Sequence, residues 1–118
     1  MEITVAPPHS IIFINDPTVD VVVPKDIGPR LVWATESCVA VGTLSEIDGL
    51  TTIQLASDFL SPTGQIAFEG AIKPPGQIVA ITTSDGEALI SISSREETRL
   101  TVWVNDSHEP DLILVRAQ

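Results

Sequence analysis

The chain of 118 residues carries 16 acidic but only six basic side chains, which gives it a formal net charge of −10 at pH 7. This balance disfavours nucleic acid and anionic membranes as partners, since both require clustered Lys and Arg. The negative charge either attracts a cationic partner or serves only to keep the protein soluble. The length predicts one domain over residues 1–118 with a self-sufficient core.

From the N-terminus onward, short runs rich in Val, Ile and Thr are separated by turn residues, among them Gly28-Pro29 and Ser84-Asp85-Gly86. The runs recur about every 8–12 residues, which is typical of an all-β sandwich or barrel. The predicted strands span residues 10–14, 19–23, 31–34, 38–43, 51–56, 65–72, 77–83, 87–93, 99–104 and 112–116.

Helical periodicity is nearly absent from the sequence. Apolar residues nowhere follow a 3.6-residue period over a full helix length, so only residues 57–60 and 94–98 are candidates for single helical turns. A parallel α/β architecture, which needs crossover helices, is therefore disfavoured. We predict an all-β fold: a single-domain antiparallel β-sandwich of about eight to ten short strands.

The last two runs predict a β-hairpin whose long loop holds the densest cluster of ionisable groups in the chain. Val102 and Val104 alternate with Thr101 and Trp103, so the valines point inward and Trp103 points outward. Two interpretations of Trp103 stay open: a neighbouring loop covers it, or it is an exposed aromatic anchor for a partner. Trp33 lies in a run without a polar face, and we expect it in the core.

The loop of this hairpin, residues 105–111, is also the best candidate for a metal site. Its ionisable side chains are Asp106, His108, Glu109 and Asp111. Carboxylate oxygens suit calcium, and an added imidazole would admit zinc or manganese. The alternating acidic pattern of a dedicated calcium loop is missing, however, and an acidic loop that is only solvated remains the alternative.

Catalytic motifs are missing from the sequence. Cys38 lies inside an apolar strand, where a cysteine usually behaves as a small hydrophobe, and the chain has only two histidines to serve as bases. The sequence contains no Gly-x-Ser-x-Gly elbow, phosphate loop or dinucleotide fingerprint. We therefore expect a non-enzyme without a cofactor.

The location of the protein follows from three negative observations. No stretch approaches the roughly 20 apolar residues of a membrane span. The N-terminal residues lack the basic region and long apolar stretch of a signal peptide, and Cys38 alone forms no internal disulfide. We expect a cytoplasmic protein.

Protein binding fits the acidic loops and the outward tryptophan together, because complementary charge accelerates association and an aromatic side chain supplies a desolvated anchor. The candidate partner-binding residues are Trp103, Asp106, His108, Glu109, Asp48 and Asp85, with Asp58 also near a loop. The alternatives are a calcium- or small-ligand-binding sandwich and a structural subunit of a homo-oligomer. The apolar run 19–23 is a candidate subunit interface or edge strand for the last of these.

The order of runs resembles the competence protein J-like family of small β-rich bacterial proteins. The matching features are Ile11-Ile12-Phe13-Ile14 followed by Asp16, Trp33 ahead of Ala40-Val41-Gly42, Asp48-Gly49 ahead of Thr52-Ile53-Gln54-Leu55, the Asp85-Gly86 turn, and Leu100-Thr101-Val102-Trp103. The chain departs from the family pattern at Glu97-Thr98-Arg99, where a Gly-Tyr pair is expected, and it contains no tyrosine. The resemblance implies a β-rich fold and an inhibitor of a DNA-entry nuclease, without assigning the inhibitory role to particular residues.

Overall fold

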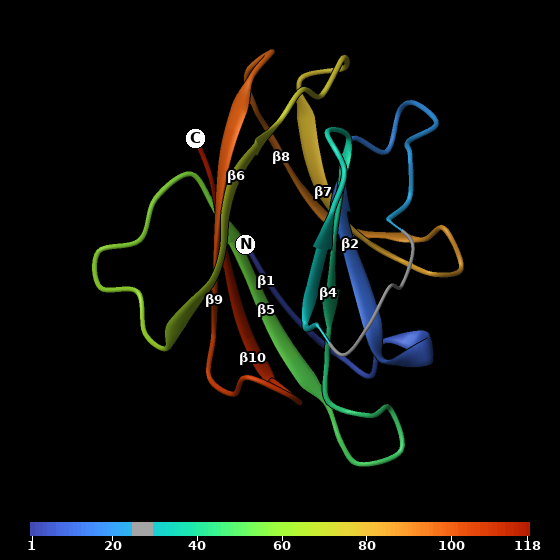
Figure 1. The fold of residues 1–118 in the computed structure, drawn as a ribbon, viewed down its shortest axis with the longest axis vertical. Helices are drawn as coiled ribbons and strands as arrows, with labels where there is room; N and C mark the ends of the chain where they lie inside the picture. The colour runs from blue at the N-terminus through green and yellow to red at the C-terminus, as the bar shows by residue number, and fades with distance from the viewer. Residues whose placement is uncertain (25–29) are drawn as a thin grey trace.

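Two five-stranded sheets face each other in the computed structural model, which describes residues 1–24 and 30–118 (Figure 1). Sheet A has the order β1 (Glu2–Val5), β5 (Thr51–Ala56), β10 (Leu112–Ala117), β9 (Thr98–Val104) and β6 (Gln65–Ile72). Sheet B has the order β3 (Val32–Ala34), β4 (Cys38–Gly42), β2 (Ile11–Asn15), β7 (Ile78–Thr83) and β8 (Ala88–Ser93). The predicted all-β sandwich is confirmed. The predicted turn at Gly28-Pro29 lies outside the described residues.

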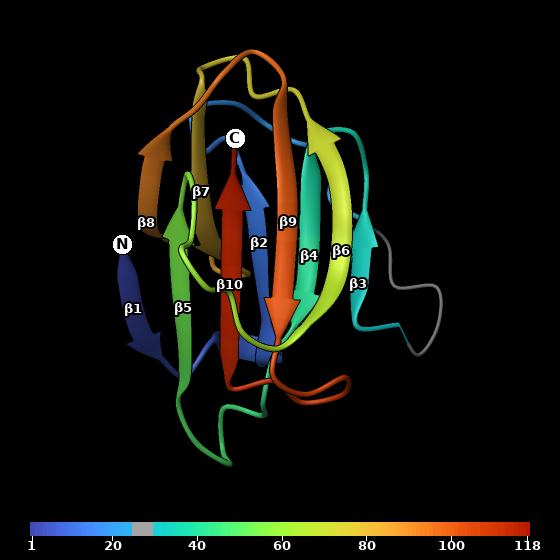
Figure 2. The ribbon, with the colours of Figure 1, turned by 90° about the vertical axis from the view of Figure 1, so that its left-hand side faces the viewer.

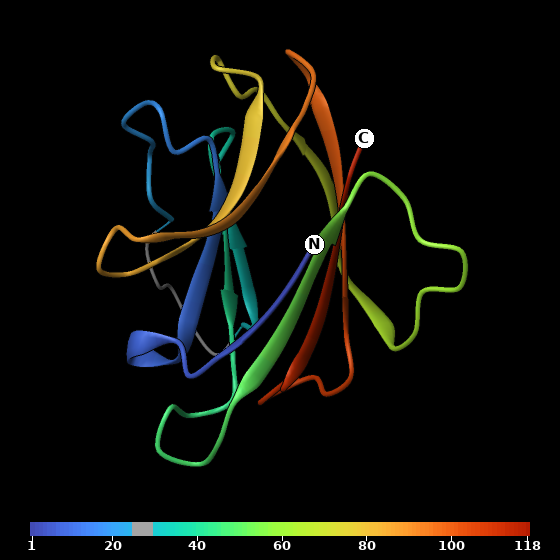
Figure 3. The same cartoon turned by 180° about the vertical axis from the view of Figure 1, so that it is seen from behind.

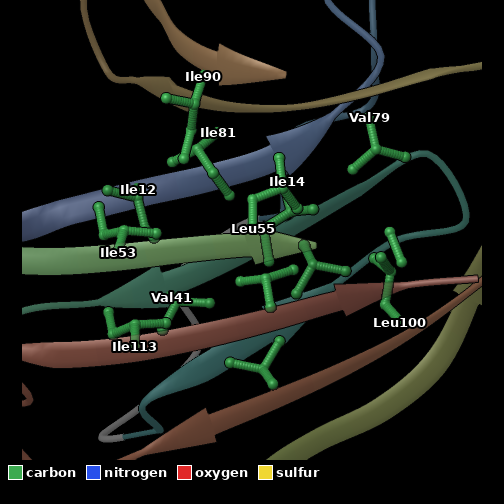
Figure 4. Packing of buried hydrophobic residues seen from close by; sticks show 14 of the residues in the cluster. Ile12, Ile14, Val41, Ile53, Leu55, Val79, Ile81, Ile90, Leu100 and Ile113 are labelled. Carbon is green, nitrogen blue, oxygen red and sulfur yellow. The ribbon is translucent and has the colours of Figure 1, made fainter. Parts of the chain in front are cut away.

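The core lies between the two sheets because alternate residues of each strand point inward. Ile12 and Ile14 of β2 meet Ile53 and Leu55 of β5 across the sandwich, and all four are fully buried (Figure 4). Burying such a side chain stabilises the fold by about 1.5–3 kcal/mol. The alternating pattern of the sequence therefore places the apolar side chains between the sheets, where their burial is the main source of stability.

The predicted C-terminal hairpin is confirmed: β9 pairs antiparallel with β10, with Val104 opposite Ile113. One pair differs from the antiparallel expectation, since β10 runs parallel to β5 and places Ile113 beside Ile53. After passing through sheet B as β7 and β8, the chain re-enters sheet A as β9, which runs opposite to β5 (Figure 2). The hairpin after β9 then reverses the chain, so β10 runs in the direction of β5. The sequence analysis missed β1, which pairs antiparallel with β5 at the edge of sheet A, although the residues of Glu2–Val5 alternate between exposed and half-buried.

The strand predicted at residues 19–23 is wrong. The segment has no strand partner, because side chains bond its backbone instead: Val22 N–H donates to Ser37 Oγ at 2.8 Å, and Thr35 Oγ1 donates to Val22 O at 2.6 Å. Val21 and Val23 line a small pocket together with Cys38. Val21 and Val23 therefore lie over the outer face of sheet B beside Cys38, while Val19, Val22 and Val23 keep much of their surface exposed.

That cover explains why Cys38 is fully buried although it lies on the outer side of β4. Burial raises the pKa of its thiol to about 12, so the thiolate does not form at neutral pH. The expectation that Cys38 behaves as a small hydrophobe agrees with this environment.

Neither predicted helical turn forms. At residues 94–98, Thr98 Oγ1 accepts a hydrogen bond from Arg95 N–H and donates one to Arg95 O, so a side chain closes the turn before β9. At residues 57–60, Asp58 Oδ1 accepts a hydrogen bond from Phe59 N–H in an irregular loop. The one helix of the described residues is a short 3₁₀ turn at Pro8–Ser10, η1, and no described helix has the length and apolar character to cross a bilayer.

A buried carboxylate joins two segments that are distant in sequence. Asp16, 1% exposed, accepts hydrogen bonds from the hydroxyl and the N–H of Thr18 at 2.6 and 2.9 Å. Its other oxygen accepts a hydrogen bond from Gly76 N–H at 2.5 Å. We call these three residues the Asp16 clasp, because they tie the segment after β2 to the β6–β7 turn.

Candidate functional site

Three segments meet at one end of the sandwich: η1, the β4–β5 loop (43–50) and the β9–β10 loop (105–111) (Figure 3). The two loops are joined by Leu44 N–H, which donates to Pro110 O at 2.9 Å. The 3₁₀ turn is joined to the first loop by Thr43 N–H, which donates to Ser10 O at 2.9 Å. We call residues 8–10, 43–50 and 105–111 the acidic loop end.

Exposed carboxylates are concentrated at this end. They are Glu46, Asp48, Asp106, Glu109 and Asp111, five of the 16 acidic residues of the chain. The structure thus brings together Asp48, Asp106, His108 and Glu109, which the sequence analysis selected from separate loops. Such a concentration of charge produces a negative potential that attracts a cationic partner and accelerates its encounter.

Hydrogen bonds within the β9–β10 loop fix its shape. Asp106 Oδ1 accepts from the N–H groups of His108 and Glu109 at 2.8 and 2.9 Å. The N–H of Glu109, then that of His108, lowers the pKa of Asp106, which therefore stays ionised well into the acid range. Asn105 Nδ2 donates to Asp111 Oδ1 at 2.6 Å across the base of the loop.

The metal site predicted at Asp106, His108, Glu109 and Asp111 is not formed. Among residues 1–24 and 30–118, no three His, Cys, Asp or Glu side chains have the proximity that a metal ion needs. The reason is that the loop uses its carboxylates internally: Asp106 binds backbone N–H groups and Asp111 binds Asn105. The arrangement therefore gives no support to the calcium alternative.

Trp103 points outward as predicted, but it is only 7% exposed. The ring of Phe59, on the β5–β6 loop, packs edge-on against it with centroids 6.0 Å apart. The guanidinium of Arg116 lies 5.1 Å from the centroid of the indole ring and also pairs with Asp58 at 4.0 Å. The hypothesis of an exposed aromatic anchor is therefore wrong, and the interpretation in which a loop covers Trp103 is correct.

The exposed apolar side chains of the acidic loop end are aliphatic. Ile47 is 89% exposed and Leu50 is 61% exposed, both in the loop that carries Asp48. The sequence analysis missed them, although an isoleucine between two acidic residues in a turn serves no strand pattern and was a usable signal. Apolar side chains within a charged surface are typical of binding sites.

A pocket of about 270 Å³ opens beside the loops, lined by Arg30, Trp33, Ser45, His108, Glu109 and neighbouring residues. Trp33 was expected in the core, but it is half-buried on the outer side of edge strand β3. Its Nε1 is shielded from solvent, and no described residue accepts a hydrogen bond from it. The pocket therefore contains a donor that a bound group would satisfy.

Asp85, another predicted partner-binding residue, lies outside the loops that make up the acidic loop end. It is exposed on the β7–β8 turn, which projects from the side of sheet B (Figure 1). Ser84 Oγ of that turn donates to Pro8 O at 3.4 Å, so the turn approaches η1 but contributes no lining to the pocket beside the loops.

Comparisons with known proteins bear on the fold. No protein-family model matches this sequence, and no curated protein matches it. Among solved structures, the chain is similar to ComJ from Bacillus subtilis, the inhibitor of the DNA-degrading activity of NucA. The TM-score is 0.72 at 9% sequence identity, over 99% of this chain and 93% of ComJ. The resemblance to the competence protein J-like family is thus confirmed at the level of the fold.

Proposed function

We propose that this chain is a non-catalytic protein-binding module that inhibits a basic, nucleic-acid-cleaving enzyme through its acidic loop end. One observation carries the proposal: five exposed carboxylates and two exposed aliphatic side chains lie on two loops that are hydrogen-bonded to each other. The likeness of the fold to ComJ, which inhibits a nuclease, supports the choice of enzyme class.

The mechanism follows from electrostatic complementarity. A nuclease must hold the phosphates of its substrate in a positively charged cleft, and carboxylates at comparable positions would compete for that cleft. The loop carboxylates would set the association rate and orientation, while Ile47 would pack into an apolar part of the cleft rim. Ile47 thereby takes the anchoring role that the sequence analysis gave to Trp103.

The test is inhibition of the nuclease activities of the source cell, separated on a cation exchanger and assayed with micromolar purified protein. We expect loss of activity in a basic fraction, with inhibition weakening as salt rises, because exposed charges are screened over about 10 Å at 0.1 M. Unchanged activity in every fraction would refute the proposal.

Matched charge variants locate the surface. The triple variant Glu46→Gln, Asp48→Asn and Glu109→Gln removes three charges from the acidic loop end while keeping each side chain's acceptor oxygen. We expect the rate at which this variant associates with the enzyme to fall at least tenfold at low salt. Electrostatic attraction raises the association rates of charged protein pairs by about this factor or more. The control removes three exposed charges elsewhere, with Glu87→Gln, Glu96→Gln and Glu97→Gln, and its rate should change much less.

A further inference from the structure

A second depression lies at the end of the sandwich opposite the acidic loop end. It has a volume of about 580 Å³ and is lined by Ser57, Ser93, Ser94, Arg95, Arg99, Ala117 and Gln118. These residues lie at the ends of β5, β8 and β10 and at the start of β9, which Figure 2 shows together at the top of the sandwich. We call this depression the arginine groove.

The two guanidiniums of the groove have no ionic partner among the described residues. The described part of the chain contains one ion pair between side chains within 4.0 Å, that of Arg116 with Asp58. Arg95 and Arg99 are both exposed, and neither pairs with a carboxylate of residues 1–24 or 30–118, although Glu96 and Glu97 follow Arg95 directly and acidic residues outnumber basic ones 16 to six. Two of the four arginines of the chain, Arg95 and Arg99, therefore lie together in the groove, where a ligand can reach them.

A buried hydroxyl points to the same conclusion independently. Ser94 Oγ is shielded from solvent, and no described residue forms a hydrogen bond with it. The backbone of Ser94 is fixed, because its N–H donates to Gln77 O at 2.8 Å. A buried hydroxyl without a partner is unfavourable, so an acceptor that reaches it would remove a penalty already present in the fold.

We propose that the arginine groove binds an oxyanion, with a phosphate group as its ligand. Each guanidinium presents five N–H donors in a fixed fork, and the hydroxyls of Ser57, Ser93 and Ser94 add further donors. A carboxylate has two oxygens to share among these donors, whereas a phosphate has three or four. The count of donors therefore favours phosphate, whether inorganic or part of a phosphate monoester.

The net charge of −10 does not prevent this binding. The five carboxylates of the acidic loop end lie at the other end of a molecule whose longest dimension is 36 Å. At physiological ionic strength the screening length is about 8 Å, so these charges contribute little to the potential in the groove. Glu96 and Glu97 are nearer, but they are exposed and do not line it.

The experiment is a titration of the ¹⁵N-labelled protein with inorganic phosphate, followed by the backbone amide resonances at constant ionic strength. Acetate titrates a parallel sample, and a phosphate monoester titrates a third, which distinguishes the two sources of phosphate. We expect saturable shifts at Ser94, Arg95 and Arg99, with a Kd on the order of 1 mM for inorganic phosphate and at least tenfold weaker binding of acetate. Tighter binding of the monoester would assign the groove to an esterified phosphate.

Variants assign the effect to the groove. Arg95→Gln and Arg99→Gln are exposed substitutions and should fold normally, yet each should weaken phosphate binding at least tenfold. Lys73→Gln removes an exposed cation outside the groove and should leave the Kd unchanged. The proposal is overturned if the shifts do not saturate, if acetate binds as tightly as phosphate, or if Lys73→Gln weakens binding as much as the arginine variants do.

Discussion

Two aspartates of this protein make the same kind of hydrogen bond in opposite surroundings. Asp16 and Asp106 each accept two backbone N–H groups, and in each the pKa lies below the ordinary value of 3.8. For Asp106 the backbone N–H groups are the dominant cause. For Asp16, burial raises the pKa, but the hydrogen bonds from Thr18 and Gly76 together outweigh it.

The difference between them lies in exposure and in reach. Asp16 is 1% exposed and bonds to Gly76, 60 positions away, so it holds two parts of the fold together. Asp106 is exposed and bonds only within its own loop, so it shapes a surface. Backbone N–H groups bonded to a carboxylate therefore stabilise the fold where water is excluded, whereas at an exposed loop they orient a surface charge.

The largest effect is expected from Asp16→Asn. The amide replaces one acceptor oxygen by an NH₂ group that faces either the donors of Thr18 or Gly76 N–H, so a buried donor loses its partner. We expect a loss of about 3 kcal/mol in the free energy of unfolding, measured by urea denaturation. Asp20→Asn, an exposed aspartate on the same segment, is the matched control and should change stability by less than about 0.5 kcal/mol.

Gly76→Ala tests the same clasp from its other side. The added Cβ would collide with Thr18 Oγ1 and lie 2.9 Å from Asp16 Oδ2. Since the φ of Gly76 is not in the left-handed region, these contacts alone determine the loss of stability. We expect a loss of about 2 kcal/mol. In the Asp16→Asn background the cost should be smaller, because the clasp is already broken; fully additive losses would contradict the coupling.

The pH dependence of Asp16 provides a third test. A carboxylate with a depressed pKa in the folded state contributes stability above its ordinary value of 3.8, and that contribution is lost as the pH falls through the folded pKa. The gap in unfolding free energy between the wild type and Asp16→Asn should therefore narrow below about pH 4. Since the other carboxylates are common to both proteins, their titration cancels. A gap that stays constant down to pH 2 would contradict the assignment.

The sequence predicted most strands because the alternation of apolar residues along each strand is a local property. Residues 19–23 show the limit of predicting strands from this alternation. The apolar run predicts a strand, but its backbone forms hydrogen bonds with the side chains of Ser37 and Thr35, and its valines lie beside Cys38 instead. The outward direction of Trp103 could likewise be predicted from the alternation within its own strand. Its burial could not, because it depends on Phe59 and Arg116, which come from other elements.

The candidate sites were harder to predict, because each is assembled from distant segments. The acidic loop end depends on the bond between Leu44 and Pro110, and the arginine groove depends on the meeting of the ends of β5, β8 and β10. Neither pairing leaves a local signature in the sequence. The metal hypothesis meets a related limit, because proximity in sequence does not reveal that Asp106 and Asp111 already form hydrogen bonds within the loop itself.

The smallest effect on stability is expected from Asp106→Asn, which sharpens the comparison with Asp16. The amide keeps an oxygen that accepts from His108 and Glu109, and the side chain is exposed, so the melting temperature should match that of the wild type within error. Binding should respond differently, because the substitution removes one charge from the surface proposed to meet a basic enzyme. We expect slower association at low salt and an equal rate at high salt, measured by stopped-flow mixing with the inhibited enzyme. A large fall in melting temperature would show that Asp106 supports the fold as Asp16 does, and the distinction between the two aspartates would then fail.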